Sequence, residues 1–139
     1  MKRYNRILIV DDNEVDIWVA SKIIEYTIPY NELVVARSGP EALRYFAESA
    51  NIPDLVFVDL YMPLMNGFHL IKTMIESHPE FSAQRTRIIP LSVSENIRDV
   101  DAVKRLGITD FILKPLDQHK LRFLLSGSTY PDRSPCGQA

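Results

Sequence analysis

Five polar residues stand at or directly after the ends of short apolar runs in this sequence: Asp11, Asp12, Asp59, Ser92 and Lys114. Carboxylates that crowd together repel one another, so they either raise one another's pKa or bind a cation. Oxygen ligands with room for water suit Mg²⁺, which prefers a few carboxylates together with phosphate oxygens. The aspartates therefore indicate a site for a divalent cation, provided that the fold brings them together.

The chemistry open to these residues is phosphoryl transfer to a carboxylate. With a cation bound nearby, Asp59 would stay ionised and could attack phosphorus, which gives an aspartyl phosphate. The cation would neutralise charge on the transferring group. The ammonium of Lys114 and the hydroxyl of Ser92 would each donate to a phosphoryl oxygen. The loss of one such donor is expected to cost about 2–4 kcal/mol of transition-state stabilisation.

Each of these residues also has an ordinary structural interpretation. An aspartate after a strand, such as Asp12, is often a helix cap. Ser92 alone would be a turn residue, and Lys114 alone a solvated charge. Their coincidence favours the chemical interpretation, because every expected strand except the second ends in a group suited to the same reaction.

Length and composition indicate one globular domain and disfavour several classes of partner. The chain has 139 residues, of which 46% are hydrophobic and 24% charged. Its net charge of -2 gives no electrostatic reason to expect nucleic acid or an anionic membrane as a partner. No apolar run is long enough to span a bilayer, and the N-terminus does not resemble a signal peptide. The single cysteine, Cys136, cannot form an internal disulfide, which fits the cytoplasm.

The elements that must position the polar residues alternate between short apolar runs and longer amphipathic ones, which favours βα units and a parallel sheet. Strands are expected at 7–10, 33–36, 54–58, 88–92 and 110–113. Helices are expected between Asn13 and Pro29, after Ser38, and at 68–77, 95–106 and 117–125, with a polar loop at 78–87. Asn13, Ser38 and Asp117 suit helix N-caps, and Gly107 suits a helix end.

Apolar residues of these elements are assigned to the core. The expected buried face of the first helix consists of Val15, Trp18, Val19, Ile23 and Tyr26. Trp18, Phe57 and Phe68 are all expected to be core residues. The βα units predict an α/β fold with an open, doubly wound sheet, in which ligands bind at the carboxyl ends of the strands. The polar residues named above stand at those ends.

Three segments resemble motifs of the response-regulator receiver family. They are Ile7-Leu8-Ile9-Val10-Asp11-Asp12-Asn13, residues 54–67 with Asp59, Pro63 and Gly67, and residues 107–115, which end in Lys114-Pro115. The likeness covers about residues 5–125 and keeps the motifs in order. It implies a flavodoxin-like (βα)5 fold with a five-stranded parallel sheet in the order 2-1-3-4-5.

The resemblance gives Asp59 the role of phosphoacceptor and implies a Mg²⁺ site around it. Asp12 and Asp59 match direct metal ligands, and Asp11 matches a residue that acts largely through water. The third protein ligand implied by the family is the backbone carbonyl of Tyr61. The expected metal residues are therefore Asp11, Asp12, Asp59 and Tyr61.

The resemblance also implies a conformational switch. Ser92 matches the family's switch hydroxyl. Phe111 matches the switch aromatic, which turns inward when Ser92 moves toward the phosphoryl group; as a single aromatic in an apolar strand it could equally be ordinary core. Lys114-Pro115 matches a pair whose peptide bond is cis in the family.

Two residues depart from the family's pattern at the mouth of the expected site. The position after the switch hydroxyl is usually small, and here it is Val93. Tyr61 is large and could screen an acyl phosphate from water. Together they predict a comparatively long-lived phosphorylated state. Phe111 lacks the hydroxyl with which a tyrosine would form a hydrogen bond after rotation.

The resemblance implies a switch of a bacterial two-component system rather than an enzyme, active only in its own phosphorylation and dephosphorylation. A sensor histidine kinase or a histidine phosphotransfer protein would donate the phosphoryl group. Residues 126–139 are expected to be a disordered tail, so the receiver is expected to stand alone and to signal in trans. The face made by 95–106, 110–113 and 117–125 would then bind a downstream protein or a second copy of the chain.

Three alternatives stay open at this point. One is a relay intermediate that passes the phosphoryl group to a histidine of another protein. Another is a flavin-binding electron carrier of the same topology, although Asp11-Asp12-Asn13-Glu14 would repel a phosphate after the first strand. The third is a degenerate receiver that serves only as a docking module, which Val93 keeps open against an otherwise complete set of acidic and basic residues.

Overall fold

Strands and helices alternate along the chain. The structure, a computed structural model, describes residues 2–48, 52–77, 86–93 and 96–126. The strands are β1 (Tyr4–Val10), β2 (Tyr30–Ala36), β3 (Leu55–Asp59), β4 (Arg87–Ser92) and β5 (Ile112–Leu113). The helices are α1 (Glu14–Thr27), α2 (Gly39–Glu48), α3 (Gly67–Ser77), α4 (Ile97–Arg105) and α5 (Gln118–Leu125). The expected succession of βα units is therefore confirmed.

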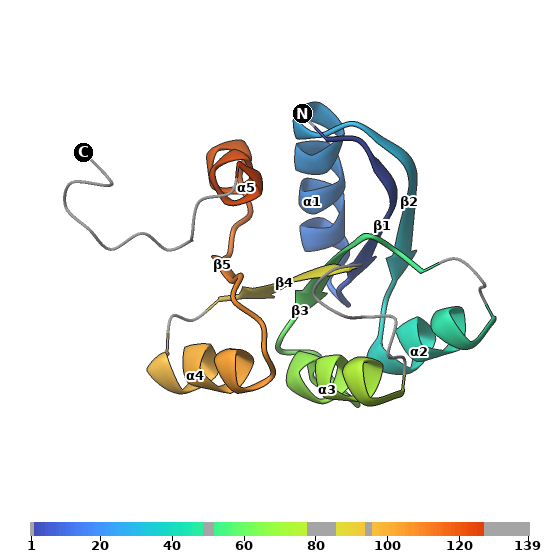
Figure 1. Cartoon of the computed structure of the whole chain (residues 1–139), viewed down its shortest axis with the longest axis vertical. Coiled ribbons are helices and arrows are strands. Elements are labelled where there is room, and N and C mark those ends of the chain that lie inside the picture. The colour runs from blue at the N-terminus through green and yellow to red at the C-terminus, as the bar shows by residue number, and fades with distance from the viewer. Residues whose placement is uncertain (1, 49–51, 78–85, 94–95, 127–139) are drawn as a thin grey trace.

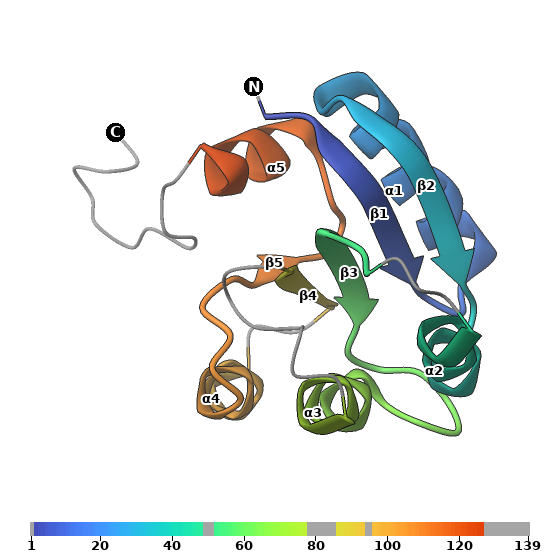
Figure 2. The ribbon, with the colours of Figure 1, turned by 45° about the vertical axis from the view of Figure 1, so that its right-hand side comes forward.

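The strands form one parallel sheet in the order β2-β1-β3-β4-β5 (Figure 2). Val10 at the end of β1 pairs with Val58, one residue before Asp59, so the ends of β1 and β3 lie side by side. Ser92 at the end of β4 pairs with Leu113, the residue before Lys114. The flavodoxin-like α/β fold and its strand order are thus as predicted, and the register brings the polar residues to one edge of the sheet.

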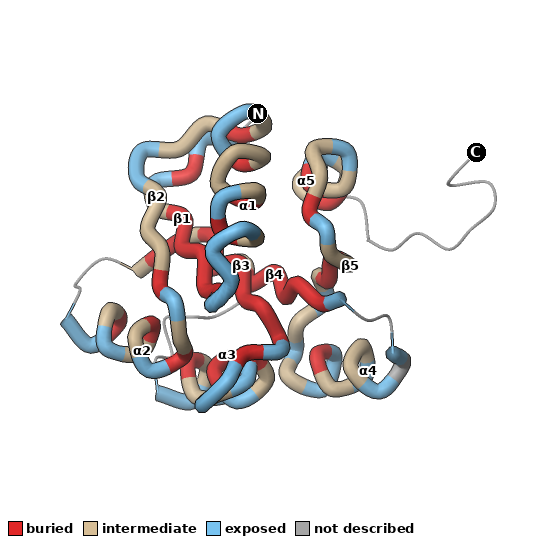
Figure 3. Tube along the Cα trace, turned by 180° about the vertical axis from the view of Figure 1, so that it is seen from behind, coloured by how far each residue is buried: buried red, intermediate tan, exposed pale blue. Residues whose placement is uncertain are grey.

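Helices cover both faces of the sheet, with α1 and α5 on one side and α2, α3 and α4 on the other (Figure 1). Successive residues of each strand point to opposite faces, so Leu8 and Val56 pack under α2–α4 while Ile7 and Phe57 pack under α1 and α5. β3 is buried at every residue, and β1 and β4 are buried from Ile7 and from Ile88 onward (Figure 3). Two buried faces explain why these strands are apolar without alternation.

The buried face of α1 differs from the prediction. Ile17, Ala20 and Ile24 face the sheet, whereas Trp18 is 63% exposed and Tyr26 is 74% exposed. Val15 is exposed as well, so its assignment and that of Trp18 to the core are wrong. The helix carries apolar residues around most of its circumference, and the stripe with small Ala20 at its centre is the one that packs against the strands. Phe57, by contrast, is fully buried as expected, and Phe68 is half-buried against the core.

β1 and β2 each begin three residues earlier than expected, β5 is shorter than expected, and β4 follows its expected course. β5 contains only Ile112 and Leu113. Asp110, which was expected to begin the strand, precedes it and forms an ion pair with Arg87. β4 runs through Pro90 although proline has no N–H for a ladder. In the described ladder between β4 and β5, the paired residues of β4 are Leu91 and Ser92, so Pro90 has no described partner in β5.

The ends of the helices follow the expected capping residues. Side-chain oxygens of Asn13, Ser38 and Asp117 accept hydrogen bonds from the N–H groups of Asp16, Glu41 and Lys120. Gly107 follows α4 with a φ of 86°. The end of α1 at Thr27 agrees with the expected stop at Pro29. These caps fix where α1, α2 and α5 begin relative to the residues at the edge of the sheet.

Two predicted segments fall mostly on residues that the structure does not describe. Most of the expected loop at 78–87 and nearly all of the expected tail at 126–139 lie outside the described residues. Among the residues that the structure does describe, no helix is both long enough and apolar enough to span a membrane.

Candidate functional site

The candidate site lies at the carboxyl edge of the sheet, where each polar residue is held by a different strand end. Asp11 follows β1, Asp59 is the last residue of β3, Ser92 is the last residue of β4, and Lys114 follows β5. Asp11, Asp59 and Ser92 are buried, whereas Asp12 is exposed. Residues up to 103 positions apart in sequence therefore meet at this edge, as Lys114 and Asp11 do.

Three carboxylates gather at this edge. Oxygens of Asp11, Asp12 and Asp59 lie within 4.8 Å of one another. Burial, followed by the neighbouring charge of Asp11, raises the pKa of Asp59 from 3.8 to about 6. A divalent cation bound beside Asp59 would offset both effects and favour the ionised carboxylate. The all-oxygen donor set and the crowded negative charge therefore fit Mg²⁺.

Local hydrogen bonds fix the acidic loop after β1. The N–H of Asp11 donates to the carbonyl of Ala36 at 3.1 Å, which extends the pairing of β1 with β2. The Asp11 carboxylate accepts the N–H of Asn13 at 3.0 Å, and Asn13 in turn caps α1. The cap thus sets the position of the loop, and the loop sets the position of Asp11.

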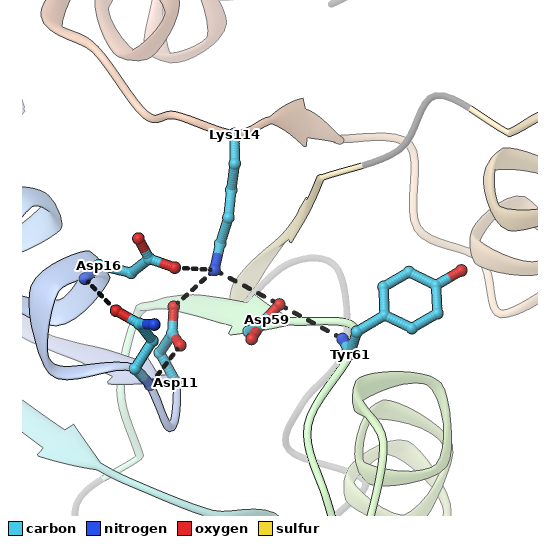
Figure 4. A network of polar contacts seen from close by, with 6 residues as sticks. Asp11, Asp16, Asp59, Tyr61 and Lys114 are labelled. Carbon is cyan, nitrogen blue, oxygen red and sulfur yellow. Dashed lines mark hydrogen bonds and ion pairs between the residues drawn. The ribbon is translucent and has the colours of Figure 1, made fainter.

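Lys114 brings a positive charge against the carboxylates. Its Nζ donates to Asp11 Oδ2 at 2.9 Å and to Asp16 Oδ2 at 2.8 Å, and it lies 3.5 Å from Asp59 Oδ1 (Figure 4). Burial opposes protonation of this amine, yet the hydrogen bonds to Asp16 and Asp11 outweigh burial and raise the pKa of Lys114 above its ordinary value. The ammonium is therefore charged when it faces Asp59.

Asp16 is a site residue that the sequence analysis did not predict. It lies in the first turn of α1, where its N–H donates to the capping oxygen of Asn13 at 2.9 Å. One signal could have found it: a helix that starts directly after the acidic pair must begin at the same edge of the sheet, so a carboxylate in its first turn lies near that edge.

Tyr61 contacts both Asp59 and α4. Its N–H donates to Asp59 Oδ1 at 3.3 Å, and its hydroxyl donates to the carboxylate of Asp99 in the first turn of α4. The hydrogen bond to Asp99 raises the pKa of the tyrosine. The Tyr61 ring packs edge-on against Phe68, with 6.1 Å between the two ring centroids, and it points away from Asp59 (Figure 4). Asp99 is a second residue that the sequence analysis did not predict, because nothing local links it to Tyr61.

The other predicted site residues occupy different environments. Ser92 is fully buried, and its carbonyl accepts the N–H of Lys114 at 2.7 Å. Val93 is 71% exposed beside it. Phe111 is buried in the core cluster that lies under α4. The Lys114–Pro115 peptide bond is cis.

Gly67 shapes the loop that follows Asp59. Its N–H donates to the carbonyl of Leu60 at 2.9 Å, which brings the start of α3 against the end of β3. A β-carbon at position 67 would lie 2.7 Å from the Cα of Leu60, closer than real β-carbons approach other atoms. Gly67 is part of the motif at 54–67, and the lack of a side chain at this position is what allows this packing.

Known proteins resemble this chain in sequence. The sequence model of the family described as "Response regulator receiver domain" matches residues 7–126. The "Regulator of RpoS" of Escherichia coli K12 is 33% identical over 132 residues, which are 91% of this chain and 35% of that protein. The "Hybrid signal transduction histidine kinase L" of Dictyostelium discoideum is 31% identical over 127 residues, which are 89% of this chain and 7% of that protein.

Solved structures agree with the fold. The crystal structure of a two-component response regulator from Cytophaga hutchinsonii superposes with a TM-score of 0.79 at 23% identity, covering 91% of this chain and 97% of that one. At this identity the likeness bears on the fold alone. The chain spans about a third or less of the two curated relatives named above.

Proposed function

This chain belongs to the response regulator receiver family, and we propose that it is a phosphorylation-activated signalling switch whose phosphoacceptor is Asp59. A receiver domain is a phosphoacceptor module rather than an enzyme, and it implies a histidine kinase as partner. The observation that carries the proposal is the acidic cluster of Asp11, Asp12 and Asp59 with the Lys114 ammonium 3.5 Å from Asp59.

Asp11, Asp12, Asp59 and the carbonyl of Tyr61 would hold Mg²⁺ at this site. The spacing of the carboxylates and the raised pKa of Asp59 support this assignment. When bound, the ion would supply charge neutralisation for the transferring group and keep Asp59 ionised. Asp12 is the exposed member of the cluster, so it is the ligand most open to exchange with solvent.

The proposed reaction is a displacement at phosphorus. An oxygen of the ionised Asp59 forms a bond to the phosphorus of a phosphohistidine, and the bond between phosphorus and the imidazole nitrogen breaks with its electron pair left on nitrogen. The phosphoryl group then resides on Asp59 as an acyl phosphate. Lys114 and the Ser92 hydroxyl would each donate to a phosphoryl oxygen and stabilise its charge. In hydrolysis, the oxygen of a water molecule would bond to phosphorus, and the bond between phosphorus and the Asp59 oxygen would break with its electron pair left on the carboxylate, which releases inorganic phosphate.

Signalling would pass from Asp59 to the face made by α4, β5 and α5. The phosphoryl group adds about -1.5 to -2 units of charge and can act only by favouring one of two existing states. The two states would differ in the position of Ser92 and in the orientation of Phe111, as in the family. The two contacts of Tyr61 support a path from Asp59 to α4, because this one residue touches both the Asp59 carboxylate and the first turn of α4.

The partners proposed for this switch are proteins. A sensor histidine kinase or a histidine phosphotransfer protein would donate the phosphoryl group, and a downstream protein or a second copy of the chain would bind the α4–β5–α5 face. As a relay, the chain would instead return the phosphoryl group to a histidine. Receiver domains generally work in the cytoplasm, and we propose that compartment here.

Incubation with acetyl phosphate, with and without Mg²⁺, tests the proposal by intact mass. We expect a gain of one phosphoryl group that needs Mg²⁺ and is absent from Asp59→Asn. A mass gain that persists in Asp59→Asn would overturn the assignment of the phosphoacceptor. No gain in a folded protein with Mg²⁺ present would favour the degenerate docking module.

A further inference from the structure

Lys114 divides its ammonium among three carboxylates, and the one that it contacts most closely is not the phosphoacceptor. Its Nζ is 2.8 Å from Asp16 Oδ2 and 2.9 Å from Asp11 Oδ2, but 3.5 Å from Asp59 Oδ1. Figure 4 shows the ammonium between Asp16 and Asp11 on one side and Asp59 on the other. The shorter contacts therefore place the ammonium closer to Asp16 and Asp11 than to Asp59.

Asp16 differs from the carboxylates that gather around Asp59. The group whose oxygens lie within 4.8 Å of one another consists of Asp11, Asp12 and Asp59, and Asp16 reaches the site through its hydrogen bond to Lys114. The side chain of Asp16 is 41% exposed, against 7% for Asp59. Water can therefore solvate Asp16 if Lys114 leaves it, which makes this contact the exchangeable one.

A phosphoryl group on Asp59 would compete with Asp16 for the same ammonium. An ammonium has three N–H donors, and two of them already point to Asp16 and Asp11. A strong bond to a phosphoryl oxygen requires the ammonium to move toward Asp59, and a carboxylate that holds it at 2.8 Å on the other side opposes that movement. The N-cap of α1 fixes the backbone of Asp16, so the carboxylate cannot simply follow Lys114.

We propose that Asp16 is a positioning residue that restrains Lys114 in the unphosphorylated state and so slows phosphorylation of Asp59. The inference rests on the proposed function, because it needs Asp59 to be phosphorylated with the help of Lys114. Asp16 acts through Lys114 and does not touch the reacting atoms. It would set how readily the receiver charges at a given supply of phosphodonor.

The test compares initial rates of phosphorylation by acetyl phosphate at saturating Mg²⁺, read by intact mass. In this reaction an oxygen of Asp59 bonds to phosphorus, and the bond from phosphorus to the donor oxygen breaks with its electron pair on acetate. Asp16→Asn and Asp16→Ser remove the charge with side chains of different size. We expect both to raise the rate by about two- to fivefold, because a partly exposed ion pair has a modest strength.

Glu14→Gln is the matched control. Glu14 is also a carboxylate in the first turn of α1, but it pairs with Arg37 rather than with Lys114. Its removal changes the net charge and the helix terminus in the same way, so the rate should stay close to that of the wild type. Equal acceleration by Glu14→Gln would overturn the proposal in favour of a general effect of charge.

Two further measurements separate positioning from a merely structural role. In a Lys114→Ala background, followed over longer incubation, Asp16→Asn should no longer accelerate phosphorylation, because its effect passes through the ammonium. The affinity for beryllofluoride with Mg²⁺, measured by ¹⁹F NMR, should rise in Asp16→Asn by about the same factor as the rate. If the wild type is phosphorylated on Asp59 but Asp16→Asn reacts no faster than the wild type, the role of Asp16 is rejected and the proposed function stands. A wild type without modification would reject the proposed function itself.

Discussion

Gly67 packs directly against the carbonyl of Asp59. A β-carbon at position 67 would stand 2.4 Å from that carbonyl oxygen, well inside the distance at which atoms repel. The neighbours are backbone atoms rather than the end of a flexible side chain, so neither can move aside cheaply. The first residue of α3 therefore fixes the backbone of the candidate phosphoacceptor.

Gly67→Ala should displace the end of β3 and impair the site. We expect a loss of about 1–3 kcal/mol in the free energy of unfolding, as for other overpacked positions. We also expect slower phosphorylation, because Asp59 would lose its alignment with Lys114. Urea unfolding and intact mass after incubation with acetyl phosphate measure the two effects. Gly107→Ala is the control: it should cost stability at a φ of 86°, where nothing lies within 4 Å, but it should leave the phosphorylation rate unchanged.

The raised pKa of Asp59 predicts a pH-dependent cost to the fold. The carboxyl binds its proton more tightly in the folded state, with a pKa of about 6 against 3.8. Its contribution is therefore favourable below pH 3.8 and is lost as the pH rises through 6. Above pH 7, without metal, Asp59→Asn should be more stable than the wild type by about 2 kcal/mol. The difference should shrink toward pH 4.

Urea unfolding in a chelating buffer at several pH values measures this difference. Added Mg²⁺ should stabilise the wild type more than Asp59→Asn, because the ion binds the folded site and the variant lacks one ligand. An advantage of Asp59→Asn that does not change between pH 4 and 7 would show that the ionisation of Asp59 is not its cause.

Arg87, the first residue of β4, links the segment before β5 to the end of α5 at the opposite edge of the sheet. Its guanidinium donates to Asp110 at 2.7 and 3.1 Å and to the carbonyl of Leu124 at the end of α5 at 3.0 Å. Arg87→Ala would leave a carboxylate that is only 13% exposed without this partner. We expect a loss of about 2 kcal/mol, below the roughly 3–5 kcal/mol of a fully buried pair, because the Arg87 side chain is 32% exposed. Arg37→Ala, which breaks the exposed pair with Glu14, should cost less than about 1 kcal/mol in the same urea titration.

The site residues that the sequence revealed are those tied to strand ends. Asp11, Asp59 and Lys114 follow apolar runs, and a parallel sheet must bring such ends to one edge, so their meeting follows from the topology. Asp99 had no such signal, because its contact with Tyr61 depends on where α4 packs. The prediction that Trp18 lies on the buried face of α1 was wrong for a related reason, since periodicity alone could not choose between the apolar stripes of that helix.

Leu64 has a backbone conformation that its side chain disfavours. Its φ is 71°, in the left-handed region, and its side chain is 93% exposed. Asparagine tolerates this region better than leucine. Leu64→Asn should therefore raise the free energy of unfolding by about 1 kcal/mol. Leu64→Ala is the control, because it shortens the exposed side chain yet keeps the β-carbon that causes the strain, so a similar gain in that variant would assign the effect to the lost apolar surface.

The lifetime of the phosphorylated state should depend on Tyr61 and Val93. Both are exposed large side chains at positions next to the candidate site, Tyr61 at 50% and Val93 at 71%. We expect them to hinder the approach of water to the acyl phosphate, so Tyr61→Asn with Val93→Ala should shorten its half-life by about tenfold, or about 1.4 kcal/mol in the hydrolysis barrier. Intact mass after removal of the phosphodonor follows the decay.

Tyr61→Phe separates shielding from the link to α4. It keeps the ring but loses the hydroxyl that donates to Asp99, so the half-life should stay within about twofold of the wild type if bulk is what matters. In this structure the ring points away from Asp59, toward Phe68 and Asp99, so shielding requires the ring to turn toward the acyl phosphate after phosphorylation (Figure 4). A half-life that Tyr61→Phe shortens as much as the double variant does would show that the hydrogen bond to α4, rather than the size of the side chain, controls hydrolysis. An unchanged half-life in the double variant would exclude both residues.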